Sequence, residues 1–423
     1  MVWLLFLLFF ILLFLRFPVA FALGISTLVY IIAAGYPLVI IPLKMYSGID
    51  VFVLLSIPGF ILAGNLMNSC GMTDRIIKLC NNFLGHIRGG LSLANIGASM
   101  VFSGISGTAI SDTASIGSVM IPAMKREGYD TAFACAVTSS SSTIGPIIPP
   151  SLPMIIAGSL TGLSIGKLFL AGAIPGLILA AGFMVVSYII SLKKNHPKQE
   201  KATWAQRGRG LIHAFWAIFM TLLILFGIIG GIFTPTEASV VAVLYALLIG
   251  TLFYKTLTWK GIQQVMTTSA GTTASLMILV GFANLFGWIL VSEKIPQNLA
   301  DFLLTITQNK YLLLLLINIL LIITGSFMET IAALLIVYPI LLKVAISVGI
   351  DPIQFSVIAV LNLIIGLNTP PVGVCLFVSS GIGKVPLEKV ARAGLPFLLV
   401  SMLVLLLVSY VPALSLFLPG LFD

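Results

Sequence analysis

Charged side chains are scarce in this sequence. Among its 423 residues, 8% are Asp, Glu, Lys or Arg, whereas 59% are hydrophobic. A soluble globular chain carries about 25% charged residues, and so few charges cannot give a protein of this size a polar surface. The composition therefore excludes a soluble protein, and with it catalysis by a folded soluble domain and binding of nucleic acid.

Cysteine and histidine are also too few and too scattered to build reactive chemistry. The 4 cysteines show no CxxC or other metal-ligand spacing, and no Ser–His pair, paired Asp or HExxH set lies within an apolar segment. We expect small core residues without disulfides and a protein that is not an enzyme. The cysteines are Cys70, Cys80, Cys135 and Cys375.

Long apolar runs fill most of the chain instead. They far exceed the ~10-residue strands of a membrane barrel, so the segments that cross the bilayer are helices, because only helices and closed barrels satisfy their backbone groups in lipid. The length of the chain leaves room for roughly ten spans. The sequence thus predicts an all-α polytopic membrane protein.

Four of the apolar segments are interrupted by small and polar residues. At about 88–126 and 310–346, Gly- and Ser-rich centres divide runs too long for one span, which predicts two re-entrant helical hairpins. At about 130–160 and 352–380, central Gly and Pro residues predict two broken transmembrane helices.

The chain repeats itself once. Asp112 lies 217 residues before Glu329, and further on Asp130 lies 221 residues before Asp351. The order of hairpin and broken helix recurs as well. Each half then crosses the bilayer five times, and an odd number inverts the second half. We therefore predict two inverted repeats, 1–211 and 212–423.

The basic residues predict the orientation in the membrane. If the Lys- and Arg-rich loop 193–209 is cytoplasmic, most of the 22 Lys and Arg residues lie on that side, as the positive-inside rule requires. Both termini are then outside the cytoplasm, and the two hairpins enter from opposite sides.

The two hairpin tips and two helix breaks are expected to meet near the bilayer midplane, since non-helical backbone is tolerated there only around a cavity. Helix N-termini suit a carboxylate, whereas free carbonyls and hydroxyls suit Na⁺. The predicted Na⁺ ligands are Ser103, Ser106, Gly107, Thr108, Ser142, Gly145, Pro146, Thr324, Gly325, Met328, Gly366, Asn368 and Thr369. The predicted substrate-binding residues are Ser139, Ser140, Thr143, Thr108 and Asn368. Close helix packing is the competing interpretation of such small residues.

Asp112 and Glu329 are the only acids placed well inside apolar segments, just past each tip. Two interpretations remain open. The carboxylates could ligate a cation or couple protons, or they could cap the returning helix of each hairpin through its free N–H groups. A capping carboxylate would still favour a nearby Na⁺.

Three stretches resemble one family: SGISGTAISDTASIGSVMIPAM, STIGPIIPPSLPMIIAG and LNLIIGLNTPPVG. The chain resembles, over essentially its whole length, the large membrane subunit of tripartite ATP-independent periplasmic (TRAP) transporters. The resemblance implies a bacterial inner-membrane protein with periplasmic termini, and an elevator mechanism with scaffold and transport domains. It also implies a separate small four-helix membrane subunit and a soluble periplasmic binding protein as partners.

The resemblance further implies uptake of a small organic acid coupled to two or more Na⁺. By motif, one Na⁺ site would fall at 103–108 and 139–146, and the other at 324–328 and 366–371. The motifs are most similar to the sialic acid branch, although C4-dicarboxylate members share them. A stand-alone Na⁺/anion symporter of the same inverted plan is the alternative.

Overall fold

The computed structural model describes residues 2–15, 17–295, 298, 302, 305, 307, 309–370 and 372–422; within α6 the side chains at 103–106 lie outside the described set. The described residues form helices and connecting turns, with no strand among them. This confirms the predicted all-α fold.

The helices up to residue 193 include the first predicted hairpin and broken helix. They are α1 (Val2–Phe14), α2 (Val19–Ala33), α3 (Ile40–Ile49), η1 (Phe52–Leu55), α4 (Ser56–Ser69), α5 (Met72–Leu84), α6 (Gly90–Ser106), α7 (Ala109–Arg126), α8 (Thr131–Ser142), α9 (Leu152–Thr161) and α10 (Ile165–Lys193).

The remaining helices include the second predicted hairpin and broken helix. They are α11 (Trp204–Ile229), α12 (Pro235–Leu248) with its extension η2 (Ile249–Phe253), α13 (Trp259–Ser292), α15 (Lys310–Phe327), α16 (Thr330–Ile336), α17 (Tyr338–Ser347), α18 (Pro352–Gly366), α19 (Val374–Gly383), α20 (Leu387–Tyr410) and α21 (Ala413–Gly420).

Seven helices within the described ranges are long and apolar enough to cross a membrane, or eight if the bent pair α16–α17 counts as one span. This is fewer than the roughly ten predicted spans. The difference has a simple cause: α1 has 13 residues and α2 has 15, and each broken helix is divided into two short pieces. A multi-pass membrane protein is nevertheless clear from the helices that remain.

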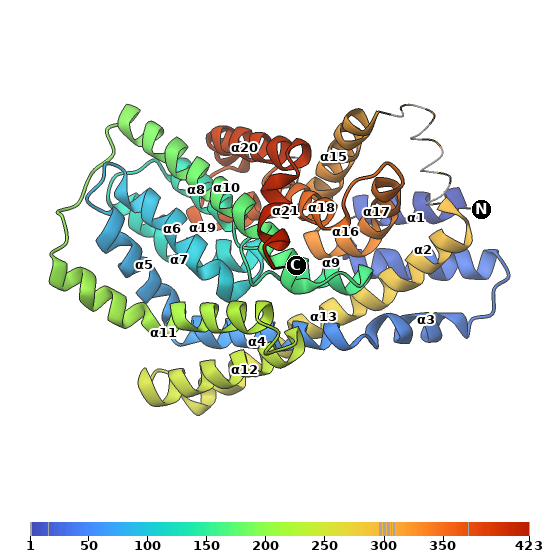
Figure 1. Ribbon diagram of the computed structural model, residues 1–423, viewed down its shortest axis with the longest axis horizontal. Coiled ribbons are helices and arrows are strands. Elements are labelled where there is room, and N and C mark those ends of the chain that lie inside the picture. The colour runs from blue at the N-terminus through green and yellow to red at the C-terminus, as the bar shows by residue number, and fades with distance from the viewer. Residues whose placement is uncertain are drawn as a thin grey trace.

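The first hairpin is the pair α6/α7, which turns at Gly107 and Thr108. Gly107 has a φ of +63°, in the left-handed region that favours glycine. The second hairpin is α15 with α16 and α17, and it turns at Met328 and Glu329. Figure 1 places α6/α7 in the left part of the molecule and α15, α16 and α17 in the right part.

The return arm of the second hairpin contains a bend that the sequence analysis did not predict. Helices α16 and α17 meet at 54°, at Val337. Pro339 is the second residue of α17, and its missing N–H removes one hydrogen bond from a continuous helix. Both predicted broken helices contain non-helical residues, at 143–151 (the first break) and at 367–370 and 372–373 (the second break); Pro371 lies outside the described residues.

The helices pack into two groups. In the first helix group, α1–α4 with α11–α13, α4 lies against α12, and α13 lies against α2, α3 and α4. In the second helix group, α6–α10 with α15–α21, α8 contacts α6, α7, α19 and α20, and α15 contacts α18. Helix α5 lies between them, against α11 and α6 (Figure 1).

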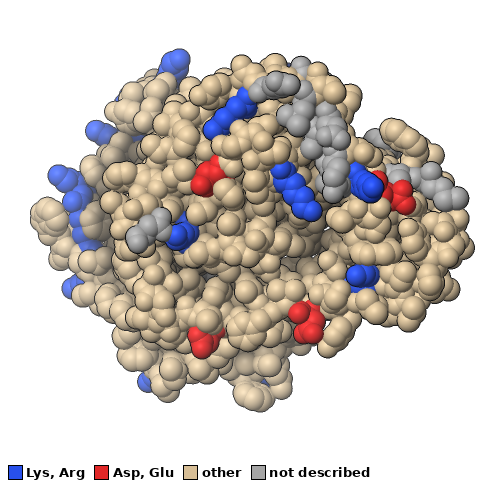
Figure 2. All heavy atoms as spheres, turned by 45° about the vertical axis from the view of Figure 1, so that its right-hand side comes forward, with Lys and Arg blue, Asp and Glu red and all other residues tan. Residues whose placement is uncertain are grey.

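The outer surface is suited to lipid. Figure 2 shows a face on which most atoms belong to uncharged residues, with Lys and Arg side chains gathered along its left edge. Large apolar side chains such as Trp3 and Ile232 are exposed, at 86% and 71%. Exposed apolar area on this scale would be unstable in water but is matched by hydrocarbon.

The basic loop after α10 folds back over the start of α8. Lys194 Nζ lies 3.4 Å from Asp130 Oδ2, and Gln199 donates a 2.6 Å hydrogen bond to Glu127. The His196 ring packs 4.4 Å from the Tyr129 ring, measured between centroids. Burial, helped by the positive charge of Lys194, lowers the pKa of His196, so this loop is packed around a neutral imidazole at neutral pH.

Candidate functional site

The first hairpin lies directly against the first break. Ser99 of α6 donates a 2.8 Å hydrogen bond to Ser141 of α8, and Asn95 donates one of 2.7 Å to Thr138. At the tip, a β-carbon added to Gly107 would lie 3.4 Å from Cβ of Leu152, the first residue of α9. Tip and broken helix are therefore in contact, and the Na⁺ site proposed for residues 103–108 and 139–146 stays a prediction.

The second hairpin crosses the second broken helix in backbone contact. A β-carbon added to Gly366 of α18 would lie 2.2 Å from the carbonyl carbon of Gly325 in α15, and one added to Gly325 would lie 2.7 Å from the Leu363 carbonyl oxygen. Only glycine fits at either position. This crossing holds the tip at Met328 beside the end of α18.

The two halves also meet each other. Asn368 Nδ2, in the second break, donates a 2.9 Å hydrogen bond to the Ser139 carbonyl at the end of α8. Ala109, at the start of α7, packs with Leu367 and Cys375, while α16 packs against α9. The four non-helical segments predicted to meet are thus brought together.

The hydroxyl groups near the breaks donate to carbonyls of their own helices. Ser142 Oγ donates to the Thr138 carbonyl at 2.7 Å, and Thr143 Oγ1 donates to the Ser140 carbonyl at 2.6 Å. Similar bonds fix Ser139, Thr324 and Thr369. A hydroxyl that donates its hydrogen bond to a carbonyl still has lone pairs on its oxygen. These lone pairs can accept a hydrogen bond or coordinate a cation.

Two oxygens at the site are buried without a hydrogen-bond partner among the described residues: Asn368 Oδ1 and Thr330 Oγ1. A buried polar atom without a hydrogen-bond partner lowers the stability of the fold. An oxygen acceptor can be satisfied by a hydrogen-bond donor or by a cation. Asn368 was a predicted ligand. Thr330 was missed, although its place directly after Glu329 in the second hairpin was a usable signal.

The two deep acids occupy different positions. Glu329 is the N-cap of α16, and its carboxylate accepts hydrogen bonds from the backbone N–H groups of Ile331 at 2.9 Å and Ala332 at 3.3 Å. The N-cap of α7 is Thr108, and Asp112 is the fourth residue of that helix, with a side chain 0% exposed. Glu329 therefore caps its helix, whereas Asp112 lies in the first turn of α7 and not at the N-cap position.

The other predicted site residues differ in exposure. Thr108, Thr324, Asn368, Thr369 and Gly107 are half-buried, and the side chains of Ser103 and Ser106 lie outside the described residues. The remaining predicted residues are buried, namely Ser139, Ser140, Ser142, Thr143, Gly145, Pro146, Gly325, Met328 and Gly366. Within the described part of the chain, no group of three or more His, Cys, Asp or Glu side chains could hold a metal ion.

A many-spanning helical protein with helix breaks gathered at one polar site has the architecture of a membrane transporter. Residues 6–414 match the family described as "Tripartite ATP-independent periplasmic transporter, DctM component". The chain belongs to that family, which confirms the resemblance read from its motifs and makes it a transporter rather than an enzyme.

Curated relatives within the family are named for different acids. The chain is 45% identical to the sialic acid TRAP transporter large permease protein SiaM of Vibrio cholerae serotype O1, covering 90% of this chain and 89% of the relative. It is 38% identical to the C4-dicarboxylate permease DctM of Pseudomonas aeruginosa, covering 89% and 88%. It is 39% identical to the isethionate permease DctMQ of Oleidesulfovibrio alaskensis, covering 95% and 64%.

Two solved structures share the fold at low sequence identity. MtrF of Neisseria gonorrhoeae aligns with a TM-score of 0.61 at 12% identity, covering 90% of this chain and 85% of that one. The YdaH transporter of Alcanivorax borkumensis aligns with a TM-score of 0.58 at 15% identity, covering 85% and 84%. These likenesses concern the arrangement of helices.

Proposed function

We propose that this chain is the large permease subunit of a Na⁺-driven importer of sialic acid, working with a periplasmic binding protein and a small four-helix membrane subunit in a bacterial inner membrane. The family supports the partners. The 45% identity to a permease named for sialic acid supports the substrate. Na⁺ coupling is supported by one observation: the buried side-chain oxygens of Asn368 and Thr330 have no hydrogen-bond partner among the described residues.

Neutral oxygens explain how Na⁺ and an acid would bind together. Carbonyls and hydroxyls at the tips and breaks would hold Na⁺ without a fixed negative charge of their own. The starts of α7 and α9 lie close together beside Gly107, and their positive dipole ends would face the substrate carboxylate. Bound Na⁺ therefore supplies the charge that balances the anion, which couples the two binding events.

Energy for uptake would come from the cation gradient and the membrane potential. Each Na⁺ that moves inward contributes about 2.3 kcal/mol per 100 mV, so two or more ions suffice for concentration without ATP. In an elevator, the second helix group would carry the site past the first helix group, and the contact of α13 with α16 would slide.

Uptake by proteoliposomes tests this proposal. The vesicles would contain this chain, the small subunit and the binding protein, with N-acetylneuraminate, succinate and isethionate compared as substrates. We expect sialic acid uptake that stops when K⁺ replaces Na⁺. Equal uptake in K⁺ would contradict Na⁺ coupling. A preference for succinate would indicate that the substrate is a C4-dicarboxylate. Uptake without the partner proteins would indicate a stand-alone symporter.

A single hydroxyl can be tested in the same vesicles. Thr330→Val keeps the shape of the side chain but removes its oxygen, and we expect the Na⁺ concentration for half-maximal uptake to rise about tenfold, the effect of one lost interaction with a charged group. Thr221→Val, in α11 of the first helix group, is the control because it makes the same substitution outside the tips and breaks, at a hydroxyl that donates to the Ala217 carbonyl. An equal effect of both variants would contradict a ligand role for Thr330.

A further inference from the structure

A basic pocket separate from the tips and breaks opens where α5 meets α11. It has a volume of about 670 Å³ and is lined from α5, from α11 and from the loop that precedes α11. Gly210 of α11 is buried against α5, where an added β-carbon would lie 2.8 Å from Asn82 Nδ2. Asn82 Nδ2 also donates to the Gln206 carbonyl at 3.2 Å. These contacts form the floor that joins the two helices.

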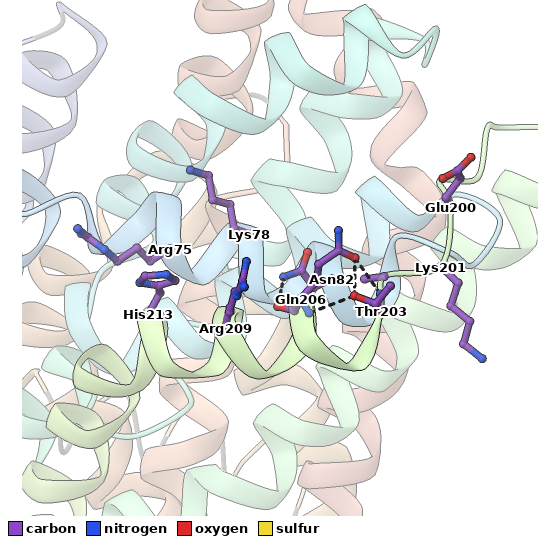
Figure 3. A pocket seen from close by; sticks show the side chains of 11 residues that line it. Arg75, Lys78, Asn82, Glu200, Lys201, Thr203, Gln206, Arg209 and His213 are labelled. Atoms are coloured by element: carbon purple, nitrogen blue, oxygen red, sulfur yellow. Dashed lines mark hydrogen bonds between the residues drawn. The ribbon is translucent and has the colours of Figure 1, made fainter.

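The lining of the basic pocket is strongly positive. Its lining includes four basic residues and one acidic residue; the basic ones are Arg75, Lys78, Lys201 and Arg209, and the acid is Glu200. Figure 3 shows the Arg209 and His213 side chains on the side of α11 that faces α5, with Arg75 beside His213, whereas Lys78 extends from α5 on the side away from α11. Lys78 and Arg209 form no ion pair with any residue the structure describes. Like charges gathered in a cleft create a potential that attracts an anion.

One of these cations is held in place before any ligand arrives. Arg75 donates through Nη1 to the Cys70 carbonyl at 2.8 Å and the Gly71 carbonyl at 3.1 Å. Its guanidinium lies 3.6 Å from the centroid of the Tyr254 ring, and the Tyr254 hydroxyl donates to the His213 carbonyl at 2.9 Å. The N–H groups that Arg75 does not use can bind an oxyanion without much further loss of side-chain freedom.

Apolar side chains continue from the basic pocket along the outside of α11. Trp204, at the first position of that helix, is 83% exposed, and Ile212 and Phe215 further along it are 71% and 47% exposed. Trp259, at the first position of α13, is 73% exposed. Tryptophans at helix ends are typical of the membrane interface. A ligand with an anionic head and an apolar body would fit the basic pocket and the adjoining apolar side of α11.

We propose that the basic pocket binds the phosphate of an anionic phospholipid, whose acyl chains lie along the exposed apolar side of α11. The charge of the pocket selects the phosphate, and the apolar surface distinguishes a lipid from a free soluble anion. The pocket lies on the side predicted to be cytoplasmic, where anionic headgroups attract basic clusters next to spans. Because α5 also contacts α6 of the first hairpin, the lipid would fix the helix that joins the two groups. This inference does not depend on Na⁺ coupling or on the substrate.

Lipid binding by the delipidated chain in detergent tests the proposal. Fluorescent phosphatidylglycerol is the probe, phosphatidylcholine is the zwitterionic comparison, and inorganic phosphate and glycerol 3-phosphate are the soluble competitors. We expect saturable binding of phosphatidylglycerol in preference to phosphatidylcholine. The double variant Lys78→Ala with Arg209→Ala should weaken it about tenfold or more, because each basic residue near the headgroup contributes substantially to the attraction.

The matched control is Lys389→Ala with Arg392→Ala, which removes one exposed Lys and one exposed Arg from the start of α20 and should bind as the unchanged chain does. Equal weakening by both double variants would overturn the proposal, since it would indicate general surface charge. Full competition by inorganic phosphate would overturn it in favour of a soluble-anion site. If the alanine pair does not fold, Lys78→Gln with Arg209→Gln keeps the side-chain bulk, and normal lipid binding by that pair would equally overturn it.

Discussion

Glu329 acts on the second hairpin through two backbone N–H groups. Its carboxylate accepts from Ile331 and Ala332 at the start of α16, so a side chain that keeps an oxygen acceptor should keep the helix start. We expect Glu329→Ala to lower the free energy of unfolding by about 1 kcal/mol, the usual cost of a lost cap, and Glu329→Gln to lower it by much less. Thermal unfolding of the purified chain in detergent measures both.

Asp351 provides the matched control for this change. It caps α18 in the same way, accepting from Ile353 at 2.8 Å and Gln354 at 3.1 Å, and lies outside the tips and breaks. Asp351→Ala should therefore cost about as much as Glu329→Ala. If Glu329→Gln were as damaging as Glu329→Ala, the negative charge rather than the cap would be what the hairpin requires.

The position of Asp112 shows where residue-level inference from the sequence stops. The sequence aligns it with Glu329 at an offset of 217, yet the returning helices begin at Ala109 and Thr330 and end at Arg126 and Ser347, both 221 apart. The two alignments differ by four residues, close to one helical turn. Such a shift preserves the phase of the apolar pattern, so periodicity alone cannot choose between them.

At the scale of elements, the sequence predicts the hairpins and breaks closely because they depend on local chemistry. Gly, Pro and Ser interrupt a helix wherever they gather, and α6, α7, α15 and α18 begin or end within a few residues of the predicted limits. The meeting of the tips and breaks was predicted, but the individual contacts between these distant segments were not. The bond from Asn368 to Ser139 joins residues 229 apart in the chain, and no periodic pattern records it.

The crossing of α15 and α18 should tolerate no side chain at its centre. In Gly366→Ala the new methyl group would lie 2.2 Å from the backbone of Gly325, so one helix must move, and overpacking of this kind typically costs 1–3 kcal/mol. We expect a lower unfolding temperature; on the proposed function, Na⁺ should also raise the unfolding temperature of the unchanged chain more than that of this variant. A differential scan with and without Na⁺ measures both effects.

Gly381 serves as the control for that substitution. It also lies inside a helix, α19, but an added β-carbon would meet no atom within 4 Å. Alanine there should leave stability unchanged or raise it by up to about 1 kcal/mol, the gain in helix propensity. If Gly366→Ala and Gly381→Ala behaved alike, the backbone contact between α15 and α18 would not limit the fold.

At the scale of the whole molecule, few charges are available to set the orientation, so the basic loop after α10 should dominate it. We expect this loop to face the cytoplasm and the base of the second hairpin to face the periplasm. Lys198→Cys and Ser347→Cys report on the two places, since both positions are exposed. The four native cysteines are buried, so the unchanged chain is the blank for a membrane-impermeant maleimide.

In right-side-out spheroplasts the cysteine at position 347 should be labelled at once, and the one at 198 only after the membrane is opened. The reverse pattern would invert the orientation, and labelling of both without opening would mean that the two hairpins enter from the same side, which the inverted repeat forbids.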